Sequence, residues 1–320
     1  MKYCSQILMM FSILLVSITG KAQTIKVTLL GTGTPLPSIE RFGPATLIEA
    51  GGQYFLFDCG RGASQRLWQN KIQLGKVNRL FLTHLHSDHI VGIPDLWLTG
   101  WLPASFGKRS SPFYVSGPAG TSSMMELLQQ AYAWDINTRK QEKNKPDSGI
   151  LVFANDIREG IVYDQGGVKI TAFTVNHADF IDSALGFRFD YAGYSVVISG
   201  DTRYSENLIK FARGTDVLIH EVAIARPELI QKSAVARQIL GYHTSPEEAG
   251  KIFSIVKPRL AIYSHIALVL TDPTIAPPTI DDVLPRTKLN YSGTVEIGED
   301  LMTIEIADKI TVKRFLNDKK

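Results

Sequence analysis

The feature that most constrains this chain is a cluster of histidines and an aspartate that follows a predicted apolar strand. The sequence Thr-His-Leu-His-Ser-Asp-His begins directly after Leu82. On an extended chain, alternate side chains point to one side, so His84, His86 and Asp88 would face together. A turn after them would bring His89 to the same place. Four ligand-type side chains within six residues indicate a metal site at the end of a strand.

Further imidazoles and acids lie at or near the ends of other predicted strands, where catalytic groups gather in α/β proteins. Asp201 and Glu221 each follow an apolar run. Neutral imidazoles combined with carboxylates suit zinc best, with manganese or iron as alternatives, and more than four ligands implies two ions. The chain has seven histidines, and the four outside the cluster are His177, His220, His243 and His265.

Short apolar runs alternate with helix-like stretches, which predicts an α/β fold. Gly51-Gly52 predicts a hairpin, and Ser245 followed by Pro246 and Glu248 predicts a helix start. We expect Arg139–Gly149 to be an exposed loop. The predicted strands are Ile25–Leu30, Thr46–Ala50, Tyr54–Phe57, Arg79–Leu82, Phe113–Ser116, Lys169–Val175, Leu185–Phe189, Ser195–Ser199, Val217–Ile219 and Leu260–Tyr263. The predicted helices are Ala63–Gln69, Ser122–Trp134, Glu206–Phe211 and Pro246–Ile255.

Residues 1–22 have the pattern of a secretory signal peptide, in which Lys2 precedes the apolar run Ile7–Ile18 and a small residue, Ala22, precedes the cleavage point. The run is too short to span a hydrocarbon core of ~30 Å, and an uncleaved anchor is the alternative. We therefore expect an exported protein, periplasmic or secreted, whose single domain over residues 23–320 is not held in a membrane.

Charge gives little support for a nucleic-acid partner. The chain has 34 Lys and Arg against 31 Asp and Glu, and the predicted signal peptide removes two lysines and no acid, leaving a formal charge of about +1. We therefore expect a small anionic ester as substrate. Cys59 would be the one remaining cysteine, so no internal disulfide is expected, and Asp58–Gly62 is interpreted as a structural turn rather than a nucleophilic site.

The His-x-His-x-Asp-His motif resembles that of the metallo-β-lactamase-fold hydrolases, and the resemblance spans nearly the whole mature chain. Ser-Gly-Asp-Thr from Ser199, His-Glu from His220, His-Thr-Ser from His243 and Ser-His from Ser264 resemble the ribonuclease Z branch. The fold that the resemblance implies is a four-layer αβ/βα sandwich with metals at one edge between the sheets. It also implies a first zinc held by His84, His86 and His177, a second held by Asp88, His89 and His265, and Asp201 as a bridge.

The chain departs from that branch in one respect. In members that process transfer RNA, a long protruding arm lies between the equivalents of His177 and Asp201 or elsewhere in the chain. Here that interval is short and is filled by two predicted hairpin strands, which leave no room for such an arm. Together with the signal peptide, this argues against RNA processing. Within the superfamily, three stretches of this sequence resemble the exported arylsulfatase-like members more closely than the ribonuclease Z branch. These stretches begin at Gly31, Arg41 and Asp95.

The chemistry also follows from the residues. Two zinc ions ~3.5 to 4 Å apart can share a hydroxide, which is the nucleophile. Asp88 would ligate one ion and orient that hydroxide. His243, paired with Glu221, would protonate the departing oxygen, although a metal-ligand role or a place at the helix start stays open. His220 is interpreted as support for these groups.

We expect hydrolysis of an aryl sulfate or a related anionic ester. A phosphodiesterase acting on RNA ends or cyclic nucleotides is the alternative enzyme, and a metal-dependent binding protein with weak catalysis is the alternative of another class. Trp97 and Trp101 lie four residues apart beside the predicted metal loop, a spacing that would let them form an apolar wall for an aromatic leaving group. Core packing or the contact of a homodimer would explain them equally well.

Overall fold

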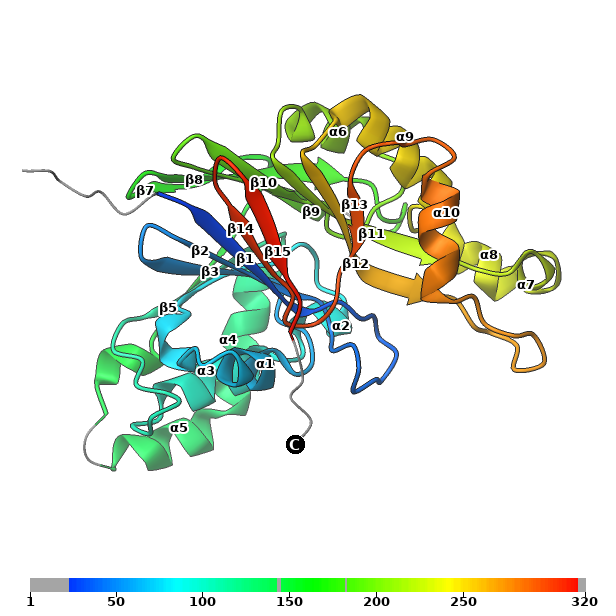
Figure 1. The fold of residues 1–320 in the computed structure, drawn as a ribbon. Coiled ribbons are helices and arrows are strands. Elements are labelled where there is room, and N and C mark those ends of the chain that lie inside the picture. The colour runs from blue at the N-terminus through cyan, green and yellow to red at the C-terminus, as the bar shows by residue number, and fades with distance from the viewer. Residues whose placement is uncertain (1–22, 143–144, 182, 316–320) are drawn as a thin grey trace, which may run out of the picture.

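The computed structural model describes residues 23–142, 145–181 and 183–315, so the predicted signal peptide lies outside the described residues. Two β-sheets face each other, and helices cover the outer face of each (Figure 1). The space between the sheets is filled by buried apolar side chains such as Phe57, Phe187 and Ile262. The four-layer αβ/βα sandwich is therefore confirmed.

The first sheet has eight strands in the spatial order β15-β14-β1-β2-β3-β4-β5-β6. From β15 to β3 neighbouring strands pair antiparallel, and β3 to β6 run parallel. The strands are β1 Ile25–Gly31, β2 Ala45–Ala50, β3 Gln53–Phe57, β4 Arg79–Phe81, β5 Phe113–Gly117, β6 Val152–Asp156, β14 Thr303–Ile306 and β15 Ile310–Lys313. The helices on its side are α1 Ala63–Gln69, α2 Ser87–Ile90, α3 Ile93–Trp101, α4 Thr121–Ala131 and α5 Ala133–Lys140, with 3-10 turns η1 Leu74–Lys76 and η2 Asp147–Ile150.

The second sheet has seven strands in the order β13-β12-β11-β10-β9-β8-β7, of which β10 to β13 run parallel. Helices α6, α9 and α10 pack on its outer face, and α7 with α8 forms a smaller cluster. The strands are β7 Gly160–Gln165, β8 Val168–Val175, β9 Ala184–Tyr191, β10 Tyr194–Ile198, β11 Val217–Ile224, β12 Leu260–Leu268 and β13 Val295–Ile297. The helices are α6 Glu206–Ala212, α7 Pro227–Lys232, α8 Ala234–Leu240, α9 Pro246–Val256 and α10 Val283–Thr287, with η3 Ile280–Asp282.

Local sequence explains the sharpest turns. Gly51 and Gly52 both have positive φ, 57° and 75°, which a two-residue hairpin between β2 and β3 requires and glycine adopts without steric cost. Helix α9 starts as predicted, because the Ser245 side chain accepts from the Glu248 backbone N–H and Glu248 reaches back to the Ser245 backbone. Among the helices in the described ranges, none has the length and apolar character needed to cross a membrane.

Each predicted strand exists, with ends shifted by a few residues. The predicted helix Ser122–Trp134 is wrong as a single element, because it breaks at Tyr132 between α4 and α5. The predicted loop Arg139–Gly149 is only partly a loop. Its first two residues belong to α5, and η2 covers its end, where Gly149 is buried.

Candidate metal centre

The candidate centre lies where strands from both sheets end. His84 and His86 follow β4, His177 follows β8, and Asp201 follows β10. Gly200, just before Asp201, has a φ of 62°, and a Cβ there would lie 2.5 Å from the Leu185 carbonyl oxygen, so this turn needs glycine. The strand ends thus bring distant parts of the sequence to one edge of the sandwich.

A local irregularity of the second sheet adds two more side chains. The parallel pairing of β11 with β12 shifts register between His220 and Val222. Glu221 lies in that irregularity, opposite His265, which has an unusual φ of 43°. Bulges re-aim side chains next to active sites, and this one carries Glu221 and His265.

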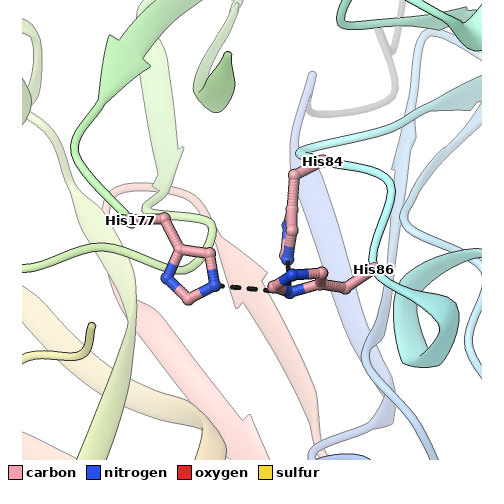
Figure 2. Close-up of side chains that lie close together, drawn as sticks. All are labelled: His84, His86 and His177. Atoms are coloured by element: carbon pink, nitrogen blue, oxygen red, sulfur yellow. Dashed lines mark hydrogen bonds between the residues drawn. The ribbon is translucent and has the colours of Figure 1, made fainter. Parts of the chain in front are cut away.

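Three imidazoles form the first ligand set, shown in Figure 2. The Nε2 atom of His84 and the Nε2 atom of His177 lie 2.9 and 3.4 Å from Nδ1 of His86. Burial lowers the pKa of each of the three side chains. Neutral imidazoles with converging nitrogens are suited to binding a metal ion.

The second set contains Asp88, His89 and His265. The Asp88 Oδ2 atom lies 3.5 Å from Nε2 of His89 and 3.3 Å from Nε2 of His265. Burial alone would raise the pKa of Asp88, but its hydrogen bond to His265 and the nearby His89 lower it. Asp88 reaches this place from the short helix α2, not from an extended chain as predicted, and His89 lies on the same helical turn.

Asp201 lies between the two sets. Its Oδ2 atom is within 3.9 Å of four imidazole nitrogens. These are Nε2 of His84 and His177 in the first set, at 3.9 Å each, and Nε2 of His89 and His265 in the second, at 3.5 and 3.2 Å. Burial would raise the pKa of Asp201, yet His265 and His89 hold it well below its usual range. This oxygen therefore lies close to ligand atoms of both sets.

Three buried polar atoms of the ligand residues lack a hydrogen-bond partner among the described residues. They are Asp201 Oδ1, His89 Nε2 and His265 Nδ1. Buried polar atoms are rarely left unsatisfied unless a ligand serves them. The donor set and the first two of these atoms therefore fit divalent cations.

Neighbouring groups hold the ligand rings in place, as is usual around metal ions. The Asp58 carboxylate accepts a 2.8 Å hydrogen bond from Nδ1 of His89 and two more from the backbone and hydroxyl of Thr83. The Nδ1 atom of His177 donates to the Tyr242 carbonyl oxygen at 2.9 Å. Sequence reasoning missed Asp58, which sits in the segment interpreted as a turn. An acid directly after an apolar strand was the available signal, as at Asp201.

His243 and Glu221 form the predicted pair. Nδ1 of His243 lies 3.2 Å from Glu221 Oε2, and Glu221 Oε1 accepts from the backbone N–H groups of Thr202 and Thr244. Although burial opposes the charged imidazole, Glu221 raises the pKa of His243 to about 9. A ligand atom of His243 also lies within 4.8 Å of those of His177 and Asp201, so His243 borders the centre.

His220 is fully buried and stands apart from the ligand sets. Its Nδ1 atom donates to the Glu221 carbonyl oxygen at 2.6 Å, and its ring packs against Phe253. His220 therefore supports the backbone of Glu221.

Trp97 and Trp101 do not form a substrate wall. Both are buried in the core beneath α3, and their indole N–H groups donate to the carbonyl oxygens of Ile150 and Pro146. Core packing, one of the two alternatives, is their role. The Cys59 side chain is fully buried.

Comparisons with known proteins agree with this geometry. The family model described as Anti-Pycsar protein Apyc1 matches residues 25–235. The ribonuclease Z of Mycolicibacterium gilvum is 34% identical over 291 residues, covering 90% of this chain and 99% of that protein. The ribonuclease Z of Mycobacterium marinum is 32% identical over 284 residues, covering 88% and 99%.

Solved structures share the fold at lower identity. The metallo-β-lactamase-fold protein YhfI from Bacillus subtilis has a TM-score of 0.67 at 20% identity, covering 88% of this chain and all of that one. Human tRNase Z, short form, has a TM-score of 0.63 at 20% identity, covering 87% and 98%. Zn²⁺-bound PqqB from Methylobacterium extorquens has a TM-score of 0.59 at 14% identity, covering 87% and 99%. The chain therefore belongs to the family described as Anti-Pycsar protein Apyc1, is related to the ribonucleases Z, and is a metal-dependent hydrolase with the metallo-β-lactamase fold.

Proposed function

We propose that this protein is a dinuclear zinc-dependent phosphodiesterase that acts on small nucleotide phosphodiesters, such as cyclic nucleotides or RNA ends. The observation that carries the proposal is the position of Asp201, whose Oδ2 atom contacts imidazoles of both ligand sets. One carboxylate between two histidine groups is the arrangement that two ions sharing a ligand need. Zinc is favoured by the imidazole-rich donor set and by the zinc-bound relative.

A phosphodiester is favoured over an aryl sulfate by two observations. The relatives that cover nearly the whole chain are named ribonuclease Z, which supports the phosphodiesterase alternative over the arylsulfatase reading. The two tryptophans that were to receive an aromatic leaving group are instead buried in the core. Both esters carry one negative charge on a tetrahedral centre, so the metal ligands alone do not distinguish them.

A small substrate is favoured over a folded RNA. In the described part of the interval between His177 and Asp201, the chain forms the β9–β10 hairpin and no protruding arm. The turn of that hairpin is short, with Ala192 and Gly193 at positive φ. The near-neutral net charge of the predicted mature chain gives little electrostatic attraction for a long polyanion.

The side chains divide the work of ester hydrolysis. His84, His86 and His177 would hold one cation and Asp88, His89 and His265 the other, with Asp201 facing both. When bound, two such ions supply positive charge at the ester oxygens and acidify a water. His243 is placed to hold a proton for the departing oxygen, because Glu221 stabilises its charged form. Asp58 fixes the orientation of His89.

The test compares matched esters of one leaving group. The purified full chain, loaded with zinc, is assayed on bis(4-nitrophenyl) phosphate and 4-nitrophenyl sulfate, with and without a chelator. We expect chelator-sensitive turnover of the phosphodiester at a kcat/KM at least tenfold above that of the sulfate. Faster turnover of the sulfate would restore the arylsulfatase reading, and turnover of neither ester would overturn the hydrolase proposal for both substrate classes.

A further inference from the structure

An aromatic side chain is exposed beside the metal centre. Phe180 lies three residues after the ligand His177, and 67% of it is accessible to solvent. Single exposed apolar side chains are common on protein surfaces, and Phe180 is distinguished by its place beside a ligand residue and by the contacts that hold it. Phe180 has no part in the metal chemistry described above.

Phe180 is held in place by a second aromatic ring. Its ring lies 5.4 Å from that of Tyr242, at an angle of 87° between the planes. The Tyr242 ring is in turn 6.3 Å from the His177 ring, and its carbonyl oxygen accepts from Nδ1 of His177. Gln238 donates to the Tyr242 hydroxyl at 2.6 Å. The two aromatic rings are therefore tied to a metal ligand on one side and to α8 on the other.

The backbone that carries Phe180 is also fixed. The Arg203 guanidinium donates to Asp179 Oδ1 at 2.6 Å and to Asn176 Oδ1 at 3.1 Å. The Arg203 backbone N–H donates to the Asn176 carbonyl oxygen, and Ile181 N–H donates to that of Ala178. Hydrogen bonds therefore hold the chain on both sides of Phe180, which restricts where its ring can lie relative to the metal centre.

We propose that Phe180, braced by Tyr242, is the platform on which the nucleobase of the substrate stacks. This inference rests on the proposed phosphodiesterase function. It identifies the residue that would contact the nucleobase, a part of the substrate that the metal ions would not contact. A hydrocarbon ring offers no hydrogen bonds to base edges, and stacking accepts every base because each has a π-face. The enzyme is therefore expected to accept purine and pyrimidine nucleotides alike.

The experiment compares two phosphodiesters that share a leaving group and differ in the base. They are thymidine 5′-(4-nitrophenyl phosphate) and methyl 4-nitrophenyl phosphate. In F180A we expect the ratio of the KM of the thymidine ester to that of the methyl ester to rise about tenfold, the low end of what base stacking contributes. The kcat values should change less, because stacking acts equally on bound substrate and transition state. F180W should restore the ratio.

Matched controls separate this role from a structural one. Trp134 in α5 is also an exposed aromatic, 79% accessible, and W134A should leave the ratio unchanged. An unchanged ratio in F180A would overturn the platform. So would an equal loss on both esters accompanied by a change in molar mass, since that would assign Phe180 to an interface between copies of the chain.

A binding measurement keeps the platform testable if the proposed function fails. Should the wild-type protein turn over neither ester, calorimetric titration of the zinc-loaded protein with thymidine 5′-monophosphate still compares wild type with F180A. About tenfold weaker binding by F180A would support the platform. Equal binding would overturn it.

Discussion

Two regions of this molecule bury charge in opposite ways. At the metal centre, Asp201 Oδ1 and His89 Nε2 are buried without a hydrogen-bond partner among the described residues. Beneath α3, the fully buried Arg109 guanidinium is surrounded by backbone carbonyl oxygens. It donates to those of Trp97, Leu96, Val77 and Leu74 at 2.7 to 3.3 Å, and it lies over the Phe113 ring.

The two regions differ in what their residues are needed for, which is activity at the metal centre and stability around Arg109. Arg109 has no carboxylate partner in the described chain, and burial lowers its pKa to about 9, but its two terminal nitrogens donate to four backbone carbonyl oxygens. Both terminal nitrogens of the guanidinium find partners within the protein, and Nε is its one nitrogen without a partner among the described residues. The metal centre keeps ligand atoms unsatisfied until cations bind, so its residues should matter for activity more than for folding.

The largest expected effect comes from the bridging carboxylate. D201N keeps the shape of the side chain and removes the charge that faces both ligand sets. We expect kcat/KM for the phosphodiester to fall by about 10³-fold or more, which corresponds to ~4 kcal/mol of lost transition-state stabilisation. Steady-state kinetics and zinc content measure the loss. The control D190N changes a partly buried carboxylate that pairs with Arg188 outside both ligand sets, and it should retain full activity. An active D201N enzyme would show that this carboxylate is not a bridge.

The second largest expected effect is on the stability of the region around Arg109. R109M removes four hydrogen bonds to backbone carbonyl oxygens, and we expect the free energy of unfolding to fall by about 3 kcal/mol. Denaturant unfolding measures it, and activity per folded molecule should stay within about twofold, because Arg109 supports packing only. R139M removes an exposed ion pair with Asp135 and should cost about 0.5 kcal/mol or less. A stable but inactive R109M enzyme would break the distinction between the two regions.

The third prediction concerns the role of His243 beside the metal centre. H243Q removes the imidazole whose protonated form Glu221 stabilises. We therefore expect about 10²-fold slower hydrolysis of esters with poor alkoxide leaving groups, which need that proton. Esters of 4-nitrophenol, whose anion leaves without a proton, should lose far less. A plot of kcat against leaving-group pKa should therefore steepen in H243Q. If all esters slow equally and zinc content falls, His243 is a metal ligand instead.

Asp58 gives the smallest effect, since it acts through His89. D58N weakens the hydrogen bond that orients the ring, and we expect about 10-fold weaker zinc binding with the fold retained. Competition with a chromophoric chelator measures the affinity. D58E restores the charge and should recover part of it. Unchanged affinity in D58N would show that the ring of His89 needs no orienting carboxylate.

Much of the fold and the metal centre could be predicted from local sequence. Strands such as Val217–Ile219 are continuous apolar runs, and their ends carry the ligands. Strands β6 and β7 were missed because they are polar and half exposed, as Asn155 and Asp164 show. Their pairing comes from neighbouring strands rather than from their own residues.

Other features depend on contacts that no local pattern reveals. Asp58 lies far from His89 in sequence, and Phe180 gains its role only through its contact with Tyr242. The spacing of Trp97 and Trp101 indicates a shared helical face but not the direction in which that face points. Tertiary packing decides whether an apolar face meets substrate or core.

The zinc stoichiometry of the full chain tests the central claim most directly. The protein is incubated with excess zinc, desalted and analysed by mass spectrometry for metal per polypeptide. Two ligand sets joined by Asp201 predict two ions per chain in the wild type and a lower content in D201N. A saturated wild-type content of one ion or fewer would contradict the dinuclear centre.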